Sequence, residues 1–134
     1  MKTFMLALAA ALALNGCATL HLDNYEDSSL SREEMQFVAK DGSDMLAAHY
    51  PPGKTALALK PAGPFGQYLV DALRAQGFGV EEQAPVTLYY LLDVMDGQHY
   101  RLGLITKDWR SDASYRRDAG NTLVRADHTQ RVAP

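Results

Sequence analysis

Apolar and polar positions repeat with two different periods along the chain, and these periods predict helices and strands. Residues 31–50 and 65–76 carry apolar side chains at spacings of three and four, which is typical of amphipathic helices. Ser31 and Glu34 fit a capping box, so the first helix should begin there. Gly77 directly follows the second apolar stripe and is well placed as a helix C-cap. The sequence therefore predicts two amphipathic helices, with a marked start for the first and a marked end for the second.

Between and after the helices, apolar residues alternate with polar ones or run together, which is typical of strands. Residues 86–95 are almost continuously apolar, and we expect one long central strand there. Asp96-Gly97 directly after it predicts a hairpin turn. Shorter or more polar strand segments complete the pattern at residues 55–60, 78–82, 98–106, 114–119 and 122–131.

This order of elements predicts an α+β fold with a small, mainly antiparallel sheet and the helices packed on one face. The other face of the sheet should be partly solvated or covered by a partner. The side chains that we expect on that open face are Tyr89, Arg101, Tyr115 and Arg117.

The first residues of the chain have a pattern of their own. Lys2 is followed by an uncharged apolar block over residues 4–14, and a small residue, Gly16, stands directly before Cys17. The block is too short to span a bilayer, which needs about 20 residues. It has the layout of a secretory signal peptide and resembles a bacterial lipoprotein signal, which implies cleavage before Cys17 and acylation of that residue. The alternative is an ordinary signal peptide with an incidental free cysteine.

These observations divide the chain into three parts. Residues 1–16 are the expected lipoprotein signal peptide, and residues 17–30 are a polar segment that we interpret as a lipidated tether. Residues 31–134 are expected to form a single periplasmic α+β domain. Within it, a helix over 31–50 precedes a compact module over 54–134.

The charge and cysteine content exclude several classes of function. Loss of Lys2 leaves 12 of the 13 Lys and Arg residues against 16 Asp and Glu, a net charge of −4. No basic tract is present, so direct nucleic-acid binding is disfavoured. An anionic membrane surface would not attract such a chain, and lipid would have to hold it there. Cys17 is the only cysteine, which excludes a disulfide scaffold and any cysteine-based metal site.

No motif in the sequence points to catalysis or to a metal. The four histidines lie in separate segments without metal-ligand spacing, and the serines lack a nucleophile-elbow motif. The aspartates between Asp93 and Asp112 do not fit an EF-hand loop, and we expect them to cap turns and charge strand ends. Residues 63–66 lack the spacing of a phosphate-binding loop. We therefore expect no catalytic residue, no metal and no cofactor other than the covalent lipid.

The single tryptophan, Trp109, falls on a predicted turn beside Arg110. A surface tryptophan next to an arginine would suit an interface hot spot, and burial in the core is the alternative. The residues that we single out as a possible partner interface are Tyr89, Arg101, Trp109 and Tyr115.

Several stretches together resemble one protein family. They are the lipoprotein signal, the polar tether, residues 64–74 (PFGQYLVDALR), Gln76-Gly77-Phe78, residues 91–97 (LLDVMDG) and Tyr100-Arg101-Leu102. With these motifs the chain resembles the TrbH family, conjugal transfer lipoproteins of plasmid type IV secretion systems. The resemblance covers nearly the whole chain and is weakest from Asn121 onward.

The resemblance implies a structural role in conjugation. It implies a small outer-membrane lipoprotein subunit that anchors the periplasmic core complex of the transfer channel. Its partners would be outer-membrane lipid and larger periplasmic subunits resembling TrbG and TrbI, assembled as a ring. Ala18 after the cysteine, in place of Asp, is associated with sorting to the outer membrane, so the protein would face the periplasm from there.

Two other classes of function remain open at this point. One is a stand-alone lipoprotein that binds or inhibits another periplasmic protein, as pilotins and inhibitor lipoproteins do. The other is an enzyme such as a cell-wall hydrolase, for which the sequence contains no motif.

Overall fold

The computed structural model describes residues 23–27 and 29–133, and these form two sheets and two long helices. The large sheet has the strand order β1-β5-β6-β7-β8 and the small sheet the order β3-β2-β4. The helices are α1 (Arg32–His49) and α2 (Pro64–Gln76), with a short 3-10 helix, η1 (Pro52–Lys54), between them. The strands are β1 (Tyr25–Glu26), β2 (Ala56–Ala58), β3 (Gly79–Glu81), β4 (Val86–Thr87), β5 (Tyr89–Asp96), β6 (His99–Ile105), β7 (Trp109–Arg117) and β8 (Leu123–Val132).

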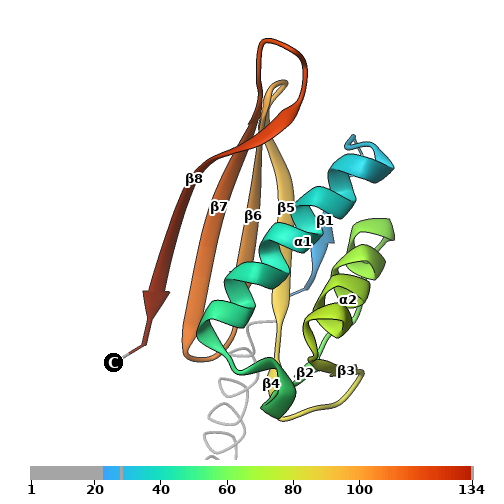
Figure 1. Cartoon of the computed structure of the whole chain (residues 1–134), viewed down its shortest axis with the longest axis vertical. Helices are drawn as coiled ribbons and strands as arrows, with labels where there is room; N and C mark the ends of the chain where they lie inside the picture. Colours follow the sequence, from blue (N-terminus) through green and yellow to red (C-terminus); the bar gives the residue numbers. More distant parts are fainter. Residues whose placement is uncertain (1–22, 28, 134) are drawn as a thin grey trace, which may run out of the picture.

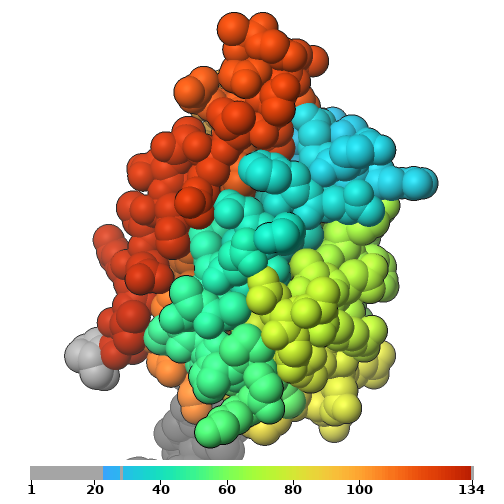
Figure 2. Space-filling view, in the orientation of Figure 1, coloured from blue at the N-terminus to red at the C-terminus, as the bar shows by residue number. Residues whose placement is uncertain are grey.

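The arrangement confirms the predicted α+β class. Strands β5 to β8 form an antiparallel meander, and β1 joins β5 as a short parallel edge strand. Both helices cover the same face of this sheet, with α1 lying across it and α2 beside α1 (Figure 1). In the space-filling view the helices lie side by side, β8 runs along one flank and the hairpin between β7 and β8 projects at one end (Figure 2).

Helix α1 begins as the capping box predicts. The Ser31 hydroxyl accepts a hydrogen bond from the Glu34 amide at 3.2 Å, and the Glu34 carboxylate accepts one from the Ser31 amide at 3.0 Å. Halfway along the helix, Gly42 faces the sheet so closely that a Cβ there would lie 2.9 Å from a methyl carbon of Leu102. The absence of a side chain at Gly42 therefore allows the helix backbone to approach the sheet closely.

Helix α2 ends at the residue that the sequence predicts. Gly77 has a φ of +107°, a left-handed conformation that favours glycine. Its amide bonds to the carbonyl of Arg74, and the amide of Phe78 bonds to the carbonyl of Leu73. Phe78 is buried behind this cap, which is the hydrophobic contact expected of such a helix end.

The long apolar run after residue 85 differs from its prediction. It does not form one strand: β4 pairs with β2 in the small sheet, and β5 pairs with β6 in the large one. Between them Leu88 is 1% exposed and its amide bonds to the carbonyl of Ala58. The run is continuously apolar because the chain passes through the core as it changes sheets, and not because one central strand is buried on both faces.

The polar segment before α1 also differs from its prediction. We expected a tether as far as residue 30, but Tyr25 and Glu26 pair in parallel with Leu91 and Leu92 of β5. Leu30 is buried in the core. The folded part of the chain therefore begins before Ser31, and the signal peptide and Cys17 lie outside the described residues.

Candidate functional site

The N-terminal segment is fixed to the fold chiefly by one carboxylate. Glu26 in β1 accepts hydrogen bonds from the backbone amides of Phe65 at 2.8 Å and Gly66 at 2.9 Å. These amides belong to the first turn of α2, where helix N–H groups have no partner within the helix. A negative charge is favoured at this end of the helix dipole. Glu26 thus caps a helix that lies far from it in the sequence.

A buried tyrosine completes this cap. The Tyr90 hydroxyl donates to the Glu26 carboxylate at 2.7 Å and accepts from the amide of Ala62 at 2.8 Å. Burial raises the pKa of Tyr90, so the hydroxyl keeps its proton and remains a donor. A Cβ at Gly66 would collide with the backbone of Pro61 at 2.8 Å, so a glycine is required where the helix turn meets this group.

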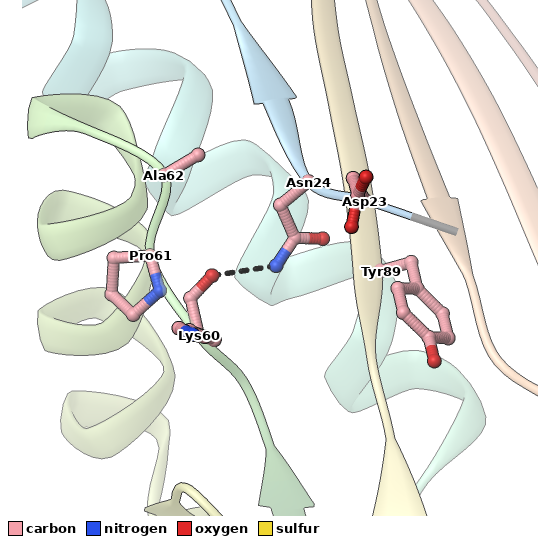
Figure 3. Close-up of a pocket in the computed structure, with 6 residues that line it drawn as sticks. All are labelled: Asp23, Asn24, Lys60, Pro61, Ala62 and Tyr89. Carbon is pink, nitrogen blue, oxygen red and sulfur yellow. Dashed lines mark hydrogen bonds between the residues drawn. The ribbon is translucent and has the colours of Figure 1, made fainter. Parts of the chain in front are cut away.

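Asn24 makes a second link between the segment and the fold. Its side-chain oxygen accepts from the Tyr90 amide at 2.9 Å, and its side-chain nitrogen donates to the Lys60 carbonyl at 2.7 Å. The amide thereby joins β5 to the loop that leads into α2. Beside it lies an open hollow of about 370 Å³. Its lining residues are Asp23, Asn24, Lys60, Pro61, Ala62 and Tyr89 (Figure 3).

Two of the four residues predicted as a partner interface lie on the open face of the sheet. Tyr89 and Arg101 are both partly exposed. Arg101 is held by an ion pair with Asp93, with 2.8 Å between its Nη2 and a carboxylate oxygen. On the same face Tyr25 is 51% exposed and is aligned with Leu91. This face therefore carries exposed aromatic and charged side chains together.

The other two predicted interface residues are core residues, so the alternative of burial holds for Trp109 and the prediction for Tyr115 is wrong. Trp109 is 2% exposed and stacks on His49, while Tyr115 is fully buried and donates to Asp41 at 2.7 Å. Strand β7 begins at Trp109, so residues 109, 111, 113 and 115 all face the helices. The predicted strand began at residue 114, which left Trp109 on a turn.

Arg117 is also not on the open face. It reaches α1, where its Nη2 lies 3.0 Å from a carboxylate oxygen of Glu34. The guanidinium holds the pKa of Glu34 below its usual value, while burial acts in the opposite sense. The pair joins the start of α1 to the end of β7.

The aspartates at turns act as caps, as the sequence predicts, whereas Asp93 and Asp112 lie inside strands and form ion pairs. Asp96 accepts from the amide of Gln98 at 2.9 Å in the hairpin turn, and Asp112 pairs with Arg110. Asp108 accepts hydrogen bonds from Tyr50 and Thr106, and the bond from Tyr50 lowers the pKa of Asp108. Within residues 23–27 and 29–133, no three His, Cys, Asp or Glu side chains gather as metal ligands would.

The chemistry that this arrangement can perform is binding and attachment. The contacts by which Asn24, Glu26 and Tyr90 hold the N-terminal segment were not predicted from the sequence. Glu26 lies in a polar stretch without periodicity, and nothing local shows that its partner is the start of α2. The α2 sequence gave a partial signal, since its Pro-Phe-Gly start offers no side-chain cap of its own.

Comparison with known proteins gives one match. A family model described as conjugal transfer protein TrbH matches residues 19–127, from before β1 into β8. Neither the curated proteins nor the solved structures contain a match. In the part of the chain that the structure describes, neither helix combines the length and the apolar character needed to cross a membrane.

Proposed function

This chain belongs to the TrbH family of conjugal transfer proteins, and we propose that it serves the transfer machinery as a structural lipoprotein of the outer membrane. Cys17 would carry the lipid, and the α+β domain would face the periplasm. There it would anchor the core complex of a conjugative type IV secretion channel, in contact with larger subunits resembling TrbG and TrbI. We assign it no catalytic step.

The observation that supports an anchoring role is the attachment of the N-terminal segment to the fold. Asn24 and Glu26 bind the loop before α2, the first turn of α2 and strand β5. A lipid placed shortly before this segment would therefore be coupled to the body of the protein. A free tether of 13 residues would couple it far more loosely.

Lipid energetics make such an anchor effectively permanent. Each buried CH₂ of an acyl chain contributes about 0.8 kcal/mol, and a lipoprotein cysteine carries three chains. In a ring of many copies the anchors would act together, because each bound copy raises the effective concentration of its neighbours at the membrane. The protein would then hold the channel core to the membrane without crossing it.

The test is Cys17→Ser in a cell that carries the transfer system. We expect the variant to leave the membrane fraction and the frequency of plasmid transfer to fall at least tenfold. The matched control is Ser29→Ala, an exposed position downstream of the cleavage site, which should leave both unchanged. Undiminished transfer by Cys17→Ser would contradict the proposal.

Affinity purification separates a channel subunit from a stand-alone inhibitor or pilotin-like lipoprotein. A channel subunit should bring down large envelope proteins in many copies per assembly. Recovery of one small partner at equal stoichiometry would favour the second role.

A further inference from the structure

The parallel pairing of β1 fixes where the chain enters the fold. Tyr25 is aligned with Leu91, and Asp23 lines the same hollow as Tyr89, so the chain enters at the start of β5. If Cys17 carries the lipid, as the proposed function requires, only five residues lie between that cysteine and Asp23. The six Cα–Cα steps from Cys17 to Asp23 reach at most about 20 Å. The start of β5 must therefore stay close to the lipid surface.

Several elements meet at this end of the molecule, which we call the basal end. Tyr89 pairs with Ile105, so the turn between β6 and β7 at residues 106–108 lies there. Tyr50, just before η1, bonds to Thr106 and Asp108, which places η1 beside that turn. The basal end thus consists of η1, residues 106–108 and the segment at Lys60 (Figures 1 and 3).

The two hairpins lie at the opposite end. Strand β5 runs from Tyr89 to Asp96, and at about 3.3 Å per residue the first hairpin lies some 23 Å from the basal end. The β7–β8 hairpin projects in the same direction (Figure 2). Each hairpin turn carries an exposed acid, Asp96 or Asp118; Asp96 pairs with His99, and the exposed Arg116 is aligned with His99.

The basal end carries three lysines that are free to meet a ligand. Lys54, Lys60 and Lys107 are exposed there, and none of the three forms an ion pair with another described residue. The other described lysine, Lys40, is paired with Asp44 on α1. The nearby acids are Asp23, which is exposed where the chain enters, Glu81 and Glu82, which are exposed at the end of β3, and Asp108, which accepts hydrogen bonds from Tyr50 and Thr106.

We infer that the basal end lies on the phospholipid surface and that the two hairpins point away from it. The short chain between Cys17 and Asp23 keeps the basal end within reach of the lipid. The three lysines meet the phosphate groups there. The hairpins are then presented to partners at a greater distance from the membrane.

The inference is tested with the lipidated full-length protein in vesicles of phosphatidylethanolamine and phosphatidylglycerol. A single donor dye is placed at Gly53→Cys, at the basal end, or at Ala119→Cys, in the β7–β8 hairpin. Acylation leaves no free thiol at Cys17, and a Cβ at Gly53 meets no atom within 4 Å. We expect energy transfer to an acceptor lipid to be at least twofold more efficient from position 53. Equal transfer, or more from position 119, would overturn the orientation.

Two variants separate the contributions of chain length and charge. Insertion of 12 Gly and Ser residues between Leu22 and Asp23 should reduce the difference between the two dyes by at least half. Replacement of Lys54, Lys60 and Lys107 by Gln should lower transfer from position 53 by at least a third. An unchanged difference after the insertion would contradict the role of the short chain, and unchanged transfer after the lysine replacement would contradict the lipid contact.

The outcome also distinguishes this inference from the proposed function. If the protein with acylated Cys17 did not stay on the vesicles, the anchoring role itself would fail. If it stayed bound but both dyes transferred equally, only the orientation would fail.

Discussion

Glu26 holds its carboxylate 2.8 Å from the backbone nitrogen of Phe65, although 39 positions separate the two residues in the chain. Through this contact the short N-terminal strand supplies the N-terminal cap that α2 lacks in its own sequence. It also ties the proposed lipid anchor to the body of the protein.

Replacement of Glu26 by Gln should destabilise the protein by about 1–2 kcal/mol. The variant keeps one acceptor for the α2 amides but loses the negative charge at the helix N-terminus and weakens the bond from Tyr90. Urea denaturation of the mature chain measures the effect. Glu82→Gln, at an exposed acid on another segment, is the control and should change the free energy of unfolding by less than about 0.5 kcal/mol. Equal stability of the two variants would show that the cap contributes nothing.

Gly42→Val should cost about 2–3 kcal/mol or prevent folding. A side chain at this position enters space that Leu102 and Leu104 already fill, and overpacking of a tight core forces displacements. The matched control is Gly53→Ala, where a Cβ meets no atom within 4 Å and the stability should be unchanged or slightly increased. Thermal unfolding of both variants checks the prediction, which a stable Gly42→Val protein would contradict.

The Glu34–Arg117 pair predicts a pH-dependent stability. The pKa of Glu34 in the folded protein lies below the usual value of 4.5, so the carboxylate stabilises the fold above about pH 4.5 and loses this effect as the pH falls through the folded pKa. Glu34→Gln should therefore be about 1–2 kcal/mol less stable than the parent protein at pH 7. The difference should shrink as the pH falls below 4.5.

Urea denaturation at pH 7, 5 and 3 measures this dependence. Glu33→Gln, at the exposed neighbouring position, serves as the control and should follow the parent protein within about 0.5 kcal/mol throughout. A difference between Glu34→Gln and the parent that stayed constant with pH would mean that the charge of Glu34 is not what stabilises the contact.

Substitution of Trp109 should lower mainly the stability of the protein, whereas substitution of Tyr89 should affect mainly its binding of partners. Trp109→Ala removes a fully buried ring and should cost about 3–5 kcal/mol. Tyr89→Ala on the open face should cost about 1 kcal/mol or less, while reducing recovery of partner proteins in affinity purification if that face is an interface. Chemical denaturation and purification from cells provide the two measurements. Normal partner recovery with Tyr89→Ala would exclude this residue as a binding anchor.

Local signals in the sequence were sufficient for the helices and for the hairpin between β5 and β6. The Ser31 capping box, the Gly77 cap and the Asp96-Gly97 turn are set by residues within a few positions of one another. Each creates a hydrogen-bonding requirement that only one local conformation satisfies. The α+β class followed, because the order of elements limits how their apolar faces can be buried.

The features that the sequence did not predict depend on distant partners. Whether Val86 to Asp96 forms one strand or two depends on β2, because β2 pairs with Val86 and Thr87 at the start of this run. The burial of Trp109 depends on where β7 begins, since a shift of one residue reverses every side chain in a strand. The role of Glu26 depends on the position of α2. No local spacing encodes any of these relations.

The parallel alignment of β1 with β5 has a mechanical consequence for an anchored protein. A pull on the chain before Asp23 acts along the strand, so it loads the Asn24 bonds, the β1–β5 ladder and the Glu26 cap in shear and at the same time. These bonds must then break together, whereas a strand peeled from its end loses them one by one. The contacts of Asn24, Tyr25 and Glu26 would thus resist a force between a moving channel and its lipid anchor. The force would be transmitted to α2 and the sheet before the chain could unfold from its N-terminal end.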